Sequence, residues 1–272
     1  MNKAIYAFIA VLLIAAAGAY YWWRQQDAQV VAPEVTPPPP VATTPAEPSI
    51  KYPIEAVAPA ETRETPLTPE SAEDRINRAL IDLLGAEAVN HFLRVENFPT
   101  RLVATVDNLD RPFASPRLWP VQPTPGRFTV EQRGEATVSA AQNHARYAPF
   151  VTLVESVNTE QAVALYVRSY PLLQSAYESL GYPGKYFNDR LVAIIDHLLG
   201  TPEPAEPPQL HLVEVKGESQ PARPWVNYQY VDPALENLSS GRKILLRVGP
   251  EHRKRLKTKL SEIRARLVGA PR

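Results

Sequence analysis

The sequence predicts a mainly α (α+β) protein, in which a helical domain with one or two small β-hairpins follows a single transmembrane helix and a disordered proline-rich spacer. Three observations support this prediction. Residues 4–23 carry no charge, residues 27–70 contain a proline every few positions, and residues 147–199 repeat apolar residues at three- and four-residue intervals. Such spacing places the apolar side chains on one helix face. The predicted organisation is an anchor over residues 1–26, a linker over 27–70 and a folded, mainly helical domain over 71–270.

The N-terminal apolar run is long enough to span a membrane once, because about twenty helical residues cover the ~30 Å hydrocarbon core. Lys3 precedes the run, and aromatic residues 20–23 end it where an interfacial belt is expected. We therefore expect a single-pass inner-membrane protein, inserted through residues 4–23, with a cytoplasmic N-terminus and a periplasmic C-terminal domain. The alternative is a cleaved signal peptide, since residues 17–19 (Ala-Gly-Ala) fit a cleavage pattern.

The linker over residues 27–70 includes four consecutive prolines, 37–40. Each proline lacks a backbone donor and disfavours helix in the residue before it, so no regular core is expected there. About forty residues of extended chain reach at most roughly 130 Å. The linker is expected to hold the folded domain away from the membrane. An alternative is that the four prolines are a ligand for an aromatic groove.

The folded domain is expected to open with short helices. Ser71 begins a capping-box sequence, and Gly85 ends the first helix. A second short helix is expected over residues 86–96, and a third over residues 101–109, for which Pro99 fits the first turn.

Two small hairpins are expected on either side of the central helices. Prolines exclude regular structure over residues 111–126, and alternating residues over 128–138 predict the first hairpin. A second proline-rich segment, residues 200–208, precedes two short strands over residues 209–216 and 225–231.

Capping residues divide the central helical stretch. Asn158 and Asn188 are expected to be N-caps, and Gly181 is expected to be a C-cap. Pro171 lies inside the periodic pattern and is expected to kink its helix. Gly249 and Pro250 precede the last helix.

The chain carries few groups suited to catalysis. It has no cysteine, and its five histidines show no paired or metal-binding spacing. Asp196 and His197 are adjacent, but adjacent helical residues point about 100° apart. Serine nucleophile elbows and glycine-rich phosphate loops are also absent from the sequence. We therefore predict no catalytic residue, no metal site and no cofactor.

The best candidate for a polar site is the pair Asp107 and Asn108. A carboxylate and a carboxamide beside each other could line a pocket together with Arg101 and Arg146. The competing interpretation is helix-end capping and turn chemistry, for which Asp and Asn are well suited.

The final helix offers a second candidate surface. Its basic residues include Arg253, Lys254, Arg255 and Lys257, and the formal charge of the whole chain is zero. Outside the inner membrane nucleic acid is not available, so the expected anions are envelope lipids or an anionic envelope polymer. The alternative is a solvated helix face without a ligand.

Several phrases occur in an ordered succession: RLVATVDNL, ARYAPFVTLVES, FNDRLVAIIDHLL and YVDPALENLSSGRKILL. Together they resemble the bacterial family filed as domain of unknown function three thousand and fourteen, over roughly residues 71–263. The resemblance implies an N-terminal anchor and a proline-rich spacer, but no activity and no catalytic residues. The segment over residues 116–125 departs from the family in its high proline content.

Taken together, these features predict a non-enzymatic, membrane-tethered envelope protein that acts as a binding or scaffold module in the periplasm. Its partner would be an envelope protein, an anionic polymer or a lipid. The alternative is an enzyme or enzyme accessory acting on cell wall or envelope lipid, with its cleft near Asp107, Asn108 and Arg146.

Overall fold

The computed structural model describes residues 50–57, 72–213 and 223–269. Within these residues the fold is mainly helical, with two small antiparallel sheets, as the sequence predicts. No helix of the described part is long and apolar enough to cross a membrane. The predicted span over residues 4–23 lies outside that part, as does Ser71 of the predicted capping box.

Three helices open the folded region: α2 (Ala72–Leu84), α3 (Ala86–Phe92) and α4 (Phe98–Asn108). Apolar residues at helical spacing place Ile76 and Leu80 of α2 in a small core against α3. The second helix ends at Phe92 and not at the predicted residue 96. The chain there pairs instead with the proline-rich segment, through a bridge between Leu93 and Val121.

The predicted first hairpin is present. Strand β1 (Val130–Arg133) pairs antiparallel with β2 (Ala136–Ser139). Gly134 lies in the turn at a positive φ of 62°, which glycine adopts without a side-chain clash. A short helix, α5 (Ala141–Ala145), follows directly.

The central stretch forms α6 (Ala148–Ser156), α7 (Thr159–Ser179) and α8 (Phe187–Leu199). Asn158 caps α7 as predicted, since its side chain accepts a hydrogen bond from the Gln161 amide at 3.0 Å. Asn188 is not an N-cap. Helix α8 begins one residue before it, and the Asn188 side chain is fully buried. Helix α7 continues through Pro171.

The C-terminal part contains the second sheet and three helices. Strand β3 (Leu210–Leu212) pairs antiparallel with β4 (Tyr228–Tyr230). Strand β4 starts later than predicted, because residues 224–227 form the 3₁₀ turn η4 (Pro224–Asn227). Residues 214–216 of the other predicted strand lie outside the described part. The helices are α9 (Pro233–Glu236), α10 (Ser240–Arg247) and α11 (Pro250–Leu267).

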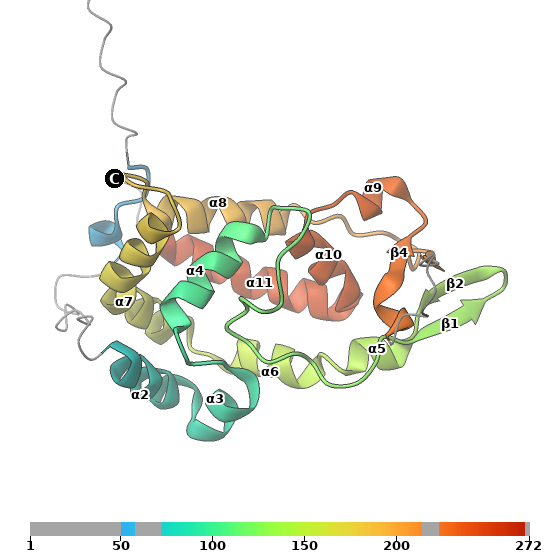
Figure 1. The fold of residues 1–272 in the computed structure, drawn as a ribbon, viewed down its shortest axis with the longest axis horizontal. Helices are drawn as coiled ribbons and strands as arrows, with labels where there is room; N and C mark the ends of the chain where they lie inside the picture. The colour runs from blue at the N-terminus through green and yellow to red at the C-terminus, as the bar shows by residue number, and fades with distance from the viewer. Residues whose placement is uncertain (1–49, 58–71, 214–222, 270–272) are drawn as a thin grey trace, which may run out of the picture. The chain divides into compact units, whose positions relative to one another are not determined.

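Helix α11 is the centre of the packing. It contacts α6, α7 and α8, and Figure 1 shows it running alongside α8. The main core contains Val103 of α4, Leu173 of α7, and Phe187 and Ile194 of α8, all almost fully buried. Burying such side chains contributes roughly 1.5–3 kcal/mol each. This core fixes the ends of α4, α7 and α8 next to one another.

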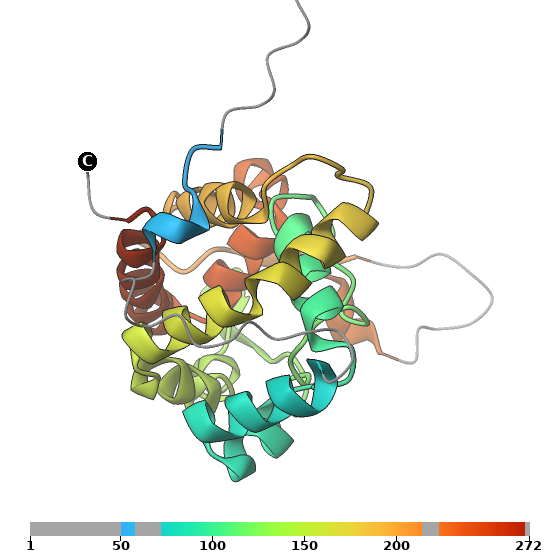
Figure 2. The ribbon, with the colours of Figure 1, turned by 90° about the vertical axis from the view of Figure 1, so that its left-hand side faces the viewer.

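Residues 50–57 lie within the range predicted as spacer, yet here they pack on the folded domain. They contain the 3₁₀ turn η1 (Ile54–Ala56), which Figure 2 shows beside the ends of α8 and α11. The backbone amides of Lys51 and Tyr52 donate to the Asp189 carboxylate at 2.9 and 2.8 Å. The amide of Ile54 donates to the Tyr186 hydroxyl at 2.6 Å. Polar side chains at the start of α8 therefore hold this segment.

Candidate functional site

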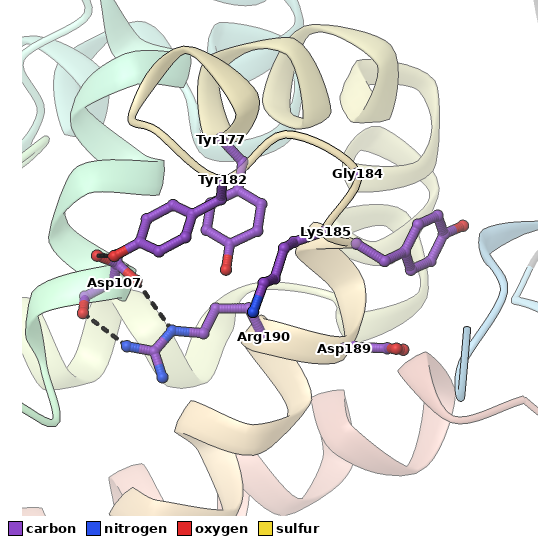
Figure 3. Close-up of a pocket in the computed structure, with 8 residues that line it drawn as sticks. Asp107, Tyr177, Tyr182, Gly184, Lys185, Asp189 and Arg190 are labelled. Carbon is purple, nitrogen blue, oxygen red and sulfur yellow. Dashed lines mark hydrogen bonds and ion pairs between the residues drawn. The ribbon is translucent and has the colours of Figure 1, made fainter. Parts of the chain in front are cut away.

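A pocket of about 470 Å³ lies where the end of α4 meets the turn between α7 and α8 (Figure 3). The core contacts among these three helices fix its position. Its lining combines tyrosine rings, charged side chains and one glycine. The residues are Asp107, Tyr177, Tyr182, Gly184, Lys185, Tyr186, Asp189 and Arg190.

Asp107 lies at the floor of this pocket and is only 4% exposed. Its carboxylate accepts three hydrogen bonds. They come from the Arg190 Nε at 3.0 Å, the Arg111 Nη2 at 2.7 Å and the Tyr182 hydroxyl at 3.0 Å. A buried carboxylate needs such partners, because an unpaired charge away from water costs several kcal/mol.

Arg190 joins two parts of the chain to α8. Besides Asp107, it binds Asp110 in a bidentate geometry, with N–O distances of 2.8 and 2.9 Å. It also donates to the backbone carbonyl of Asp107 at 2.8 Å. The planar guanidinium suits such forked contacts, and it holds the residues just after α4 against α8.

The charges of this cluster balance. Partial burial alone would lower the pKa of Arg190, but its hydrogen bonds and the charges of Asp110 and Asp107 raise it. Burial alone would raise the pKa of Asp110, but Arg190 lowers it below the usual value. The two carboxylates, of Asp107 and Asp110, and the two guanidinium groups, of Arg190 and Arg111, carry formal charges that balance.

Aromatic rings cover the other side of the pocket. Tyr177 and Tyr182 stack with ring centroids 4.7 Å apart, and both lie beside the Asp107–Arg190 pair in Figure 3. Burial, followed by the charge of Asp107, raises the pKa of Tyr177. The ring is therefore a neutral contact surface at physiological pH.

Lys185 and Asp189 complete the lining. Lys185 is exposed, and its amino group makes no ion pair with the described residues. Asp189 already accepts from the amides of Lys51 and Tyr52. Lys185 is thus the pocket cation that is open to an incoming group.

This arrangement is suited to contact more than to bond cleavage. Its floor carboxylate is almost fully buried and already accepts three hydrogen bonds, so it is poorly placed to take a proton from a substrate. The lining contains no histidine. Among the described residues, no three His, Asp or Glu side chains gather in a way that could hold a metal ion.

Comparison with known proteins gives a family match. Residues 98–264 match the family described as Protein of unknown function (DUF3014). The chain belongs to the DUF3014 family. None of the curated proteins and none of the solved structures compared with it matches the chain. The DUF3014 region runs from α4 almost to the end of α11, so it includes Asp107 and Arg190 but neither residues 50–57 nor α2.

Within the DUF3014 region, only Asp107 of the four expected pocket residues lines this pocket. Asn108 donates to the Ala104 carbonyl in its own helix at 2.7 Å. Arg101 binds the carbonyls of Glu96 and Arg117, at 2.9 and 2.6 Å. Asn108 and Arg101 therefore make local contacts with the backbone. Such contacts are the alternative to a polar pocket that the sequence left open.

Arg146 lies in a separate environment. Its guanidinium donates to the Asn143 side chain at 2.8 Å and to the Pro125 carbonyl at 3.3 Å. It therefore orders the proline-rich segment before the first hairpin. It does not join Asp107.

The basic residues of α11 do not form one free surface. Arg255 forms a bidentate pair with Glu155 of α6, and Lys257 binds Glu203 at 2.6 Å. Lys254 is exposed and makes no ion pair with described residues, whereas Arg253 is buried. The basic residues of α11 therefore have different environments: Arg255 and Lys257 are in ion pairs, Lys254 is exposed, and Arg253 is buried.

Sequence reasoning missed Arg190 and Tyr182, which complete the pocket. One available signal was the charged pair Asp189-Arg190 at the start of an otherwise apolar helix. Nothing in the sequence indicates that Arg190 faces Asp107, because the two residues are 83 positions apart.

Proposed function

We propose that this DUF3014 protein is a non-enzymatic, membrane-tethered protein of the cell envelope whose folded domain binds a partner protein in the periplasm. The pocket between α4, α7 and α8 is the proposed contact site. The uncharged run over residues 4–23 supports the membrane tether, and the proline-rich spacer would set the distance that the domain can reach.

The observation that carries this proposal is the charge-balanced network of Asp107, Asp110, Arg111 and Arg190 next to the half-buried ring of Tyr182. The ion pairs of this network join Asp107, Asp110, Arg111 and Arg190 to one another. These contacts hold α4 and the residues after it against α8. What remains for a ligand is the rim: Tyr182 and the free amino group of Lys185. Tyrosine is enriched at the centres of protein interfaces, where its ring gives contact area and its hydroxyl a hydrogen bond.

The enzyme alternative has less support. It would use a cleft near Asp107, Asn108 and Arg146, but these three side chains do not line one pocket. A non-catalytic contact needs no such convergence.

Site-specific photocrosslinking in living cells tests the proposal. The photoreactive residue replaces Lys185 at the pocket rim or, as the matched control, Glu135. Both residues are exposed, and Glu135 lies in the hairpin turn, in a different part of the fold. We expect position 185 to capture a defined envelope protein that position 135 does not capture.

A second variant links this capture to the pocket. Tyr182→Ala, combined with the photoreactive residue at 185, removes the half-buried ring while Asp107 keeps Arg111 and Arg190. We expect the captured amount to fall at least several-fold with the fold intact, as checked by circular dichroism. Equal capture from 185 and 135, or no effect of Tyr182→Ala, would contradict the proposed site. Recovery of cytoplasmic proteins alone would contradict the periplasmic placement.

A further inference from the structure

A second pocket lies at the N-terminal end of α11. Its volume is about 320 Å³, and it is bounded by the first hairpin, the proline-rich segment 204–208 and the start of α11. Its apolar side comes from Phe128, Leu210 and Leu246, which belong to one packed cluster. This volume lies at the lower end of the range of about 300–1,000 Å³ that is typical of small-molecule sites.

Arg253 lines this pocket and is the unusual residue in it. It is 6% exposed, and its side chain makes no hydrogen bond or ion pair with the described residues. Its Nε is buried without an acceptor. Buried arginine is ordinarily paired, because an unpaired buried cation costs several kcal/mol. The pocket therefore contains a cation that has no counter-ion in the part of the chain that the structure describes.

Two other arginines, Arg133 and Arg247, line the pocket together with Arg253. The imidazole of His144 also lines it, and burial lowers the pKa of that group. The one carboxylate of the lining, that of Glu206, is exposed and forms no ion pair with Arg253. Arg133 is paired with Glu131 of its own strand at 2.7 Å. The local field in the pocket thus favours an anion and does not supply one.

The backbone at the start of α11 also favours an anion in this pocket. Helix α11 starts at this pocket, and the start of a long helix carries a partial positive charge. Gly249 has a φ of 93°, and a Cβ there would lie 2.7 Å from Cγ of His144. Only glycine allows the chain to turn into α11 this close to the imidazole. The helix start is therefore pressed against the pocket wall.

We propose that this pocket binds a small amphiphilic anion, a carboxylate or phosphate group on a short apolar body, with the guanidinium of Arg253 as its counter-ion. The anionic group lies between Arg253 and the start of α11, and the apolar body lies against Phe128, Leu210 and Leu246. The site is separate from the pocket at Asp107, so either proposal can fail without the other.

Isothermal titration calorimetry on the full chain in detergent tests this site with four probes: hexanoate, hexyl phosphate, hexanol and inorganic phosphate. We expect saturable binding of hexanoate, hexyl phosphate or both, and at least tenfold weaker binding of hexanol and inorganic phosphate. The preferred head group then distinguishes a carboxylate from a phosphate ligand. Absence of binding by both amphiphilic anions would overturn the proposal, and so would equal binding of hexanol.

Two variants locate the binding. Arg253→Met removes the charge at similar length, and Lys254→Met makes the same change at the neighbouring, exposed position. We expect at least tenfold weaker anion binding in Arg253→Met and unchanged binding in Lys254→Met. Without ligand, Arg253→Met should be at least as stable as the unchanged protein, because no ion pair is lost. Arg253→Lys, which keeps the charge, should retain weakened binding. Unchanged binding in Arg253→Met would overturn the assignment.

Discussion

The Asp107 carboxylate on α4 accepts a hydrogen bond of 3.0 Å from Nε of Arg190 on α8. Arg190 also binds Asp110 just beyond α4, so one guanidinium ties two helices together. Asp107 is nearly inaccessible to water, and Arg190 is about one-quarter exposed. The pair therefore lies at the boundary between the core and the pocket.

Replacing Arg190 should destabilise the domain. In Arg190→Gln, Asp107 stays buried with only Arg111 as cation, and loss of one partner of such a pair costs about 3 kcal/mol. Urea unfolding followed by circular dichroism measures this loss. Arg264→Gln is the matched control. Arg264 on α11 forms a surface ion pair with Asp196, which lies on α8 like Arg190. That change should cost less than about 1 kcal/mol. Equal losses of unfolding free energy in the two variants would show that the Asp107–Arg190 pair stabilises the domain no more than a surface ion pair does.

Replacing Asn188 should release the segment over residues 50–57. Its buried amide nitrogen donates to the carbonyls of Tyr52 at 2.9 Å and Leu267 at 3.3 Å. Asn188→Ala leaves both carbonyls without this donor, which costs about 2 kcal/mol. We also expect faster proteolytic cleavage within residues 50–57, detected by mass spectrometry.

Asn108→Ala is the control for this change, because the Asn108 amide bonds only within its own helix. Its cleavage pattern should match that of the unchanged protein. If Asn188→Ala were cut no faster at residues 50–57 than Asn108→Ala, the side chain would not be the element that holds this segment.

The stability of the domain should fall as the pH drops from 7.5 to 5.5. Burial lowers the pKa of His197, and the charge of Arg242 lowers it further, although Asp110 opposes this shift. The unfolded chain then takes up a proton near its ordinary pKa of about 6.5, where the folded protein does not. Stability is therefore complete above about 6.5 and is lost as the pH falls through the lower, folded-state pKa.

Unfolding free energies measured at several pH values, with and without His197→Gln, check this expectation. The substitution should reduce the pH dependence, and a smaller dependence should remain because burial also lowers the pKa of His144. His211→Gln, at an exposed strand position, is the control and should leave the slope unchanged. A slope that His197→Gln leaves unaltered would contradict the assignment.

Local patterns predicted much of the secondary structure. Apolar spacing over residues 147–199 predicted α7 and α8, and Asn158 occupies the N-cap position predicted for it. These features depend on residues within one or two turns of each other. Asn188 shows the limit of this reasoning. It resembles a cap in sequence, but its donor and acceptor groups are used in the interior, by Tyr166, Tyr52 and Leu267.

In the candidate sites, too, single residues could be proposed from the sequence, but their partners in the fold could not. Asp107 could be proposed from sequence because an acidic residue at the end of an apolar helix is conspicuous. Its distant partner Arg190 could not, since any of several basic residues could have met it. The sequence likewise indicated a basic final helix, but helical periodicity alone did not show that Arg253 points inward while Lys254 points to solvent.

By itself, the sequence determined the helical class, the N-cap at Asn158 and the DUF3014 membership, because each is encoded by neighbouring residues or by an ordered succession of phrases. The tertiary structure decided which charges meet. It paired Asp107 with Arg190, and it buried Nε of Arg253 without an acceptor among the described residues. The physical reason is that burial and charge pairing depend on distances between segments far apart in the chain, and packing of α4 and α11 against α7 and α8 sets those distances.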